Sequence, residues 1–209
     1  MVADKRNTLG HLVFTVLILL ACNTSLANHK VTSDMSHGDW HSLVVNMPSA
    51  VFARAITMHV GNEGQISTFN IDSPASNCSS VFFTVNINLS ELQEQDIKSP
   101  TLFGKFRVDK QTVHDITYTL NIERGEDYIS LYISDWSRKG SVLKEIMSGS
   151  TARFQFKIDA KSYYYRFSLQ GSREALERQD QICRKFDQDD EDYFNQPEEE
   201  DDDAVYFST

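Results

Sequence analysis

Hydrophobic and polar residues alternate along most of the chain between residues 40 and 169, which is the pattern of half-buried β-strands. The clearest run covers residues 78–89, where every second side chain is apolar: Val81, Phe83, Val85, Ile87 and Leu89. Turn residues such as Gly61 and Gly125 separate these runs. About nine strands at this spacing predict an all-β fold, a β-sandwich or open barrel with antiparallel strands.

The pattern changes period after Gly171. Residues 154–158 and 163–169 alternate on either side of a short polar break and predict a hairpin. From Ser172 onward the apolar residues recur at helical spacing, on the face formed by Ala175, Leu176, Gln179, Ile182, Cys183 and Phe186. We therefore expect an α-helix over 172–186 that packs on the sheet, and a shorter helix over 141–147.

The first 27 residues have the features of a secretory signal peptide. Lys5 and Arg6 precede an apolar run over 12–21, and Ser25-Leu26-Ala27 fits a cleavage site after Ala27. A rival interpretation takes Leu19-Leu20-Ala21-Cys22 as a lipobox, in which case lipidated Cys22 would hold the protein on a membrane. Cleavage after Ala27 is favoured, so we expect a periplasmic or secreted protein, with residues 28–38 as a flexible lead-in.

Removal of this leader leaves two cysteines, Cys78 and Cys183. In an oxidising compartment they are expected to form a disulfide with each other. Such a bridge would close a loop of roughly 105 residues, and the chain-entropy model gives about 4.7 kcal/mol for a loop near that size. The alternative is two separate buried thiols. A catalytic thiol would need a paired base, and no motif in the sequence supplies one.

Charge divides the chain into two parts. Residues 28–186 contain 18 Lys and Arg and 18 Asp and Glu, whereas residues 187–209 contain 11 acidic residues and no basic ones. This composition predicts a disordered acidic tail over 187–209. Two aromatic pairs interrupt it and could anchor a protein partner, which would be basic: Tyr193 and Phe194, and Tyr206 and Phe207. A purely solubilising tail is the alternative, and nucleic-acid binding is disfavoured because the fold has no net positive charge.

Few residues in the sequence indicate a catalytic or metal-binding site. His37, Asp39 and His41 would share a face if their segment were extended, and imidazole and carboxylate groups can bind a divalent metal. Surface polar residues before a first strand are the favoured interpretation of this segment, and no cofactor is expected. The sequence has no nucleophile motif and no phosphate-binding loop. Residues 163–165 are three successive tyrosines, of which at least one must face outward from a strand.

Two short segments resemble a known family. Phe167-Ser-Leu169-Gln-Gly171, followed by Glu174-Ala175-Leu176 and Cys183, is similar to the end of bacterial periplasmic proteins of the invasion-associated locus B type, and Gly38-Asp39-Trp40 resembles the opening of their domain. The resemblance implies a β-sandwich closed by a final helix with a disulfide-bonded cysteine, in an envelope protein without established catalysis. The chain lacks the family's early cysteine after the tryptophan, and no functional residues carry over.

These observations predict one β-sandwich domain over 39–186 that works as a non-enzymatic binding protein and docks another macromolecule with the help of its tail. The first alternative is an inhibitor or immunity-type protein that blocks a basic envelope or secreted enzyme. An envelope enzyme and a metal-handling protein are further alternatives.

Overall fold

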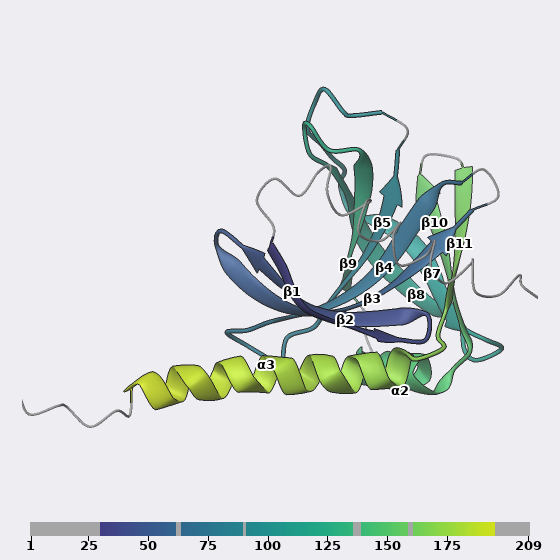
Figure 1. The fold of residues 1–209 in the computed structure, drawn as a ribbon. Helices are drawn as coiled ribbons and strands as arrows, with labels where there is room; N and C mark the ends of the chain where they lie inside the picture. Colours follow the sequence, from purple (N-terminus) through teal and green to yellow (C-terminus); the bar gives the residue numbers. More distant parts are fainter. Residues whose placement is uncertain (1–29, 62–63, 90, 136–138, 159–160, 195–209) are drawn as a thin grey trace, which may run out of the picture.

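The computed structural model describes residues 30–61, 64–89, 91–135, 139–158 and 161–194 (Figure 1). Eleven strands in this part of the chain form one antiparallel sheet. They are β1 (Lys30–His37), β2 (Trp40–Met47), β3 (Ala50–Val60), β4 (Ile66–Pro74), β5 (Phe82–Asn88), β6 (Ile97–Lys98), β7 (Leu102–Val108), β8 (His114–Ile122), β9 (Tyr128–Asp135), β10 (Thr151–Ile158) and β11 (Lys161–Ser168).

The sheet has the spatial order β1-β2-β3-β4-β5-β9-β8-β7-β10-β11, and β6 pairs with β8 outside this path. It is strongly curved, so that β11 comes back into contact with β3 (Figure 1). The curvature places the alternating apolar side chains of distant strands in one core. Phe69 on β4 contacts the rings of Phe154 on β10 and Phe167 on β11. The predicted all-β class with antiparallel strands is confirmed.

Two helices complete the described part of the chain: α2 (Lys139–Ser148) and α3 (Ser172–Phe194). Helix α2 buries Val142 and Ile146 in the core. Helix α3 contacts β1, β2, β3 and β4 and extends along the outside of the sheet, away from β11 (Figure 1). Both predicted helices are therefore present, and the C-terminal helix packs on the sheet as expected.

The two segments that carried the family resemblance lie against each other. The Asp39 amide in the β1–β2 turn donates to the Gln170 carbonyl at 3.0 Å, and the Trp40 indole Nε1 donates to the Ser168 carbonyl at 2.8 Å. Trp40 is fully buried and packs edge-on against Phe69. Because this corner joins the start of the sheet to the start of α3, it fixes the position from which the helix leaves the fold.

Three predicted boundaries need correction. Residues 30–37 of the expected lead-in form strand β1, an exposed edge strand that lacks apolar alternation because it buries almost nothing. Strand β1 and the two-residue strand β6 raise the number of strands to eleven in the described part of the chain, from the expected nine. Helix α3 continues to Phe194, eight residues beyond the predicted end and into the predicted tail, because a helix that is already formed adds residues at low cost. Residues 195–209 and the predicted signal peptide lie outside the described residues.

Candidate functional site

Helix α3 is the element that carries the predicted docking segment, and its first turns are fixed by the corner at its start. The Ser172 hydroxyl donates to the Ile146 carbonyl of α2 at 2.7 Å, and Ser172 is almost fully buried. Glu174 lies in the first turn, where the helix dipole favours negative charge. Ala175 and Leu176 are buried with the core. The helix is thus anchored by packing as well as by hydrogen bonds.

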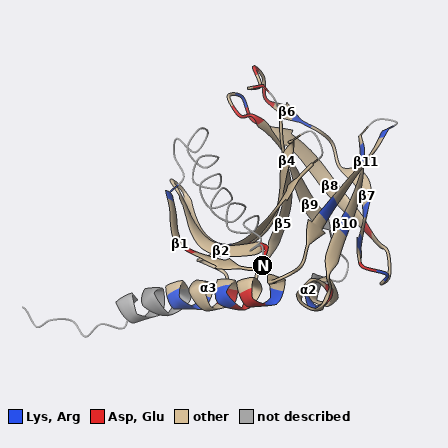
Figure 2. Cartoon of the chain, turned by 45° about the vertical axis from the view of Figure 1, so that its right-hand side comes forward, with Lys and Arg blue, Asp and Glu red and all other residues tan. Residues whose placement is uncertain are grey.

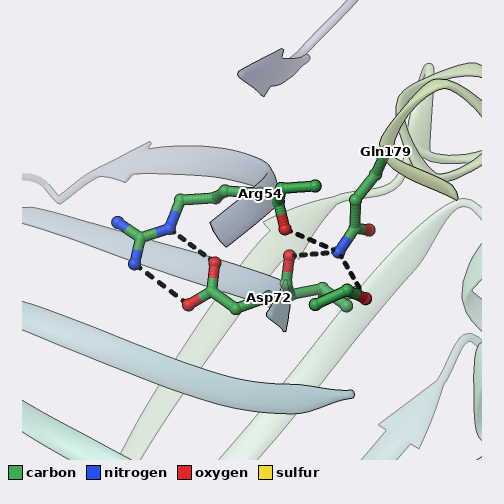
Figure 3. Close-up of polar contacts among 6 residues, drawn as sticks. Arg54, Asp72 and Gln179 are labelled. Carbon is green, nitrogen blue, oxygen red and sulfur yellow. Dashed lines mark hydrogen bonds and ion pairs between the residues drawn. The ribbon is translucent and has the colours of Figure 1, made fainter. Parts of the chain in front are cut away.

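One buried amide fixes the middle of α3 to the sheet. The Gln179 Nε2 lies 3.1 Å from the Ala53 carbonyl oxygen on β3 and 3.0 Å from the Ile71 carbonyl oxygen on β4 (Figure 3). The Ser73 hydroxyl is a further neighbour at 3.2 Å. On the adjacent side of the helix, Arg178 donates to the Ser42 carbonyl at 2.9 Å. A buried polar side chain of this kind stabilises one position of the helix, because any shift would leave the carbonyls or the amide unpaired.

A disulfide joins Cys183 of α3 to Cys78, across 105 residues of sequence and with a Cα–Cα distance of 5.7 Å. The predicted pairing is confirmed. Cys78 lies in the loop between β4 and β5, so the bond ties the fourth turn of α3 to the C-terminal end of β4. Disulfides persist in oxidising compartments, which is consistent with an envelope or secreted location.

Beyond Cys183, α3 continues for eleven residues to Phe194. This end of the helix contains five of the eleven acidic residues of the predicted tail and no basic residue in its last turn. Carboxylates at a helix C-terminus face the negative end of the helix dipole, an arrangement that a cation would relieve. Tyr193 and Phe194 are the last two residues of α3, whereas Tyr206 and Phe207 lie outside the described residues.

The proposed metal residues do not come together. Gly38 and Asp39 form a turn, so His37 lies on β1 and His41 on β2 rather than on one extended segment. His37 Nε2 is 2.7 Å from the Ser42 hydroxyl, and His41 Nδ1 is 2.9 Å from Asp34. Within the described ranges no group of three His, Cys, Asp or Glu residues is arranged to hold a metal ion.

The surroundings of His37 affect its protonation. Burial, and then the positive charge of Arg178, lower the pKa of His37 below its ordinary value, while Glu174 and Asp34 act in the opposite direction. His37 is therefore held in the neutral form more strongly than a free histidine. Through Ser42, it links β1 to β2 and to Arg178 of α3.

A polar cluster on β3 and β4 is not evident from the sequence. Arg54 and Asp72 lie directly opposite each other on these strands and form a bidentate ion pair (Figure 3). Arg54 Nε is 2.6 Å from one carboxylate oxygen of Asp72, and Nη2 is 3.0 Å from the other. Burial lowers the pKa of Arg54, but the charge and hydrogen bond of Asp72 outweigh this and raise it. No spacing rule could show this pair, because the strand register brings the two residues together.

A buried acceptor accompanies this ion pair. Asn70, two residues from Asp72 on the same face of β4, is almost fully buried, and its Oδ1 has no hydrogen-bond partner in the described part of the chain. On β9, burial and then the charges of Glu126 and Glu123 raise the pKa of Tyr128 to about 12. These groups form a polar region of the sheet without the nucleophile and base arrangement that acyl or phosphoryl transfer needs.

The side chains of the three successive tyrosines of β11 point alternately to the two faces of the sheet, as in any β-strand. Tyr164 is 71% exposed on the outer face, whereas Tyr165 packs against the core next to Phe156. Tyr163 is also exposed. The prediction that at least one of these rings faces outward is confirmed. None of the helices in the described ranges combines the length and the apolar character required to cross a membrane.

Comparison with known proteins gives one informative similarity. No model of a protein family matches the chain, and no curated protein sequence matches it. Among solved structures, the fold is similar to the crystal structure of invasion associated protein B from Bartonella henselae, with a TM-score of 0.51. The match has 11% sequence identity and covers 74% of this chain and 99% of that one. At this identity the similarity shows the fold alone, and it agrees with the resemblance in the sequence.

Proposed function

We propose that this chain is an exported, non-enzymatic binding protein that docks a basic macromolecule with its acidic C-terminal segment. One observation carries the proposal: α3 is fixed to the sheet up to Cys183 and then extends for eleven further residues with a run of carboxylates. A rigid support that presents charge at a defined position reduces the entropy lost on binding. The disulfide between Cys78 and Cys183 supports export, because disulfides persist in oxidising compartments.

Electrostatics favour a partner of positive charge. The 11 acidic residues of 187–209 are the source of the mature chain's negative charge, because residues 28–186 are balanced. Such a segment accelerates encounter with a basic surface, and aromatic residues within it supply apolar contact after arrival. The four aromatic residues proposed for this contact are Tyr193, Phe194, Tyr206 and Phe207.

The test is capture of partners from an envelope extract with the mature chain as bait. The matched control retains every residue of the chain but replaces the 11 acidic residues of 187–209 by Asn and Gln, so that length and aromatic residues are unchanged. We expect the acidic bait, and not the neutral one, to retrieve a basic protein, and we expect the capture to weaken steeply above physiological salt. Equal retrieval by both baits would contradict the proposal.

A second variant separates charge from apolar contact. Replacement of the four aromatic residues by Ser keeps the full charge of the segment. We expect this variant to find the partner at a similar rate but to release it faster, because complementary charge mainly sets association and buried aromatic residues mainly set dissociation. Surface plasmon resonance with the captured partner would measure both rates.

A further inference from the structure

Three arginines form a row across the last strands of the sheet. Arg107 on β7 is directly opposite Arg153 on β10, and Arg153 is directly opposite Arg166 on β11. All three point away from the core, because their neighbours Phe106, Phe154 and Phe167 are buried. Lys and Arg residues accordingly mark adjacent stretches of these strands in Figure 2. We call this surface the arginine face.

Two exposed aromatic rings accompany the arginines on the same face. Phe103 on β7 is 70% exposed, and Tyr164 on β11 is 71% exposed. Gln155 lies between the strands of these rings and donates to the Tyr164 hydroxyl at 3.1 Å. Exposed aromatic rings that lie beside a row of guanidinium groups offer a partner both apolar contact and charge.

The arginine row is unfavourable for folding. Like charges directly opposite each other on neighbouring strands destabilise a sheet. Within the described residues, none of the three arginines forms an ion pair; Arg153 donates instead to the Asp109 backbone carbonyl at 3.2 Å. Lys105, one row along, is paired with Asp115 at 3.0 Å, and the Asp109 carboxylate at the end of the row accepts hydrogen bonds from the Ser150 and Thr151 amides. A ligand with several carboxylates would relieve the repulsion between the arginines.

We propose that the arginine face receives the acidic C-terminal segment of a second copy of this chain. The inference rests on the proposed docking role of that segment and names its partner. Charge complementarity supports it, because the segment supplies 11 carboxylates for a row of guanidinium groups that can each bind a carboxylate at two points. The aromatic residues of the segment match the exposed rings of Phe103 and Tyr164.

Geometry favours a second copy over the same molecule. Helix α3 begins four residues after β11 ends and extends away from it over 23 residues, a length of about 33 Å. The second acidic run, residues 198–203, follows Phe194 by at most nine residues and can reach back no more than about 30 Å. A contact within one molecule would therefore require residues 195–203 to be fully extended and directed straight back along the helix, whereas a contact between copies has no such requirement.

The contact joins two different surfaces, so it is head-to-tail. Such an interface extends into longer assemblies unless its geometry closes a ring. We expect the mature chain to form concentration-dependent species larger than a monomer at low ionic strength, and these species to dissociate as salt screens the charges.

The decisive experiment mixes two full-length variants that each lack one surface. The first carries Arg107→Glu and Arg166→Glu and retains its acidic segment. The second has the 11 acidic residues of 187–209 replaced by Asn and Gln and retains its arginine face. In analytical ultracentrifugation we expect each variant alone to be monomeric and the mixture to form a 1:1 dimer. In the same assay, Lys98→Glu, a charge reversal on β6 outside the arginine face, should leave self-association unchanged.

Several distinguishable results would overturn the proposed contact between copies. A mixture that stays monomeric under conditions where the unmodified chain associates would overturn the inference, as would undiminished self-association of the arginine variant alone. A third outcome is that the variant with the neutral segment binds a polyanion such as heparin but does not associate with the variant that carries Arg107→Glu and Arg166→Glu. The arginine face would then have another occupant, and the inference would again be overturned. Capture of a foreign basic protein by the acidic segment, without association between copies, would leave the proposed function intact and remove this inference.

Discussion

At the scale of single residues, the corner between the β1–β2 turn and α3 depends on the absence of one side chain. Gly171 has φ +90°, and a Cβ built there would lie 1.6 Å from the His37 carbonyl oxygen. Two elements distant in sequence therefore meet backbone to backbone at this point. The glycine in the Leu-Gln-Gly segment that carried the family resemblance is thus required both by its backbone conformation and by this close approach.

We predict that Gly171→Ala is strongly destabilising and that Gly125→Ala is its matched control. Gly125 has a similar φ of +87°, but a Cβ there would meet nothing within 4 Å. Gly125→Ala should lower the free energy of unfolding only by the strain of a left-handed backbone conformation, about 1–2 kcal/mol. Gly171→Ala should cost at least about 2 kcal/mol more, because the corner must open to admit the methyl group. Chemical denaturation measures both, and equal losses would show that the contact with His37 is not tight.

A second residue-scale prediction concerns pH. The pKa of His37 is lowered in the folded protein, so the unfolded chain binds a proton more readily and folding favours the neutral ring. The resulting stability is full above the ordinary pKa of about 6.5 and is lost as pH falls below it. We expect the melting temperature to fall between pH 7 and pH 5, and to fall less in His37→Gln, which keeps a polar side chain but does not titrate. Identical pH profiles would refute this assignment.

At the scale of elements, α3 is held by three kinds of contact: apolar packing of Ala175 and Leu176, the hydrogen bonds of Gln179, and the disulfide of Cys183. They follow one another along little more than two turns of the helix, from Ala175 to Cys183. The disulfide is the last of these three contacts along the helix, and Phe186, three residues further on, is still half-buried.

We predict that the double variant Cys78→Ala, Cys183→Ala folds but loses about 2–5 kcal/mol of unfolding free energy, because the bond closes a loop of 105 residues. Since Gln179 and the apolar face remain, α3 should stay helical up to that turn. Guanidinium denaturation measures the free energy of unfolding, and hydrogen exchange of the α3 amides shows which turns of α3 remain helical. Loss of protection along the whole of α3 would show that the disulfide, rather than packing, holds it.

These contacts also show how far the sequence could lead. The strands of the core, the C-terminal helix and the pairing of Cys78 with Cys183 follow from local periodicity and from the number of cysteines, so they could be predicted. Strand β1 could not, because an exposed edge strand has no apolar alternation. The Arg54–Asp72 pair and the arginine row could not either, since β7 and β10 are neighbours only through the fold, and their register is not written in either strand alone.

At the scale of the whole molecule, charge is separated rather than absent. The balanced part of the chain places a row of arginines on β7, β10 and β11, while residues 187–192, which include five acidic residues, belong to the end of α3 that extends away from β11 (Figure 1). Each surface is unfavourable by itself: like charges face each other in one, and carboxylates face the negative end of a helix dipole in the other. Binding between copies would relieve both.

This arrangement predicts that stability and association respond in opposite directions to one substitution. Arg107→Glu places a carboxylate directly opposite Arg153, so a repulsive cross-strand pair becomes attractive, and unfolding free energy should rise by about 0.2–1 kcal/mol. Self-association should weaken, because the row loses a carboxylate-binding guanidinium. Lys98→Glu on β6 makes the same charge change away from the row and should alter neither quantity appreciably. If Arg107→Glu instead lowers stability, the arginine row contributes to folding, and the argument that it is retained for binding is lost.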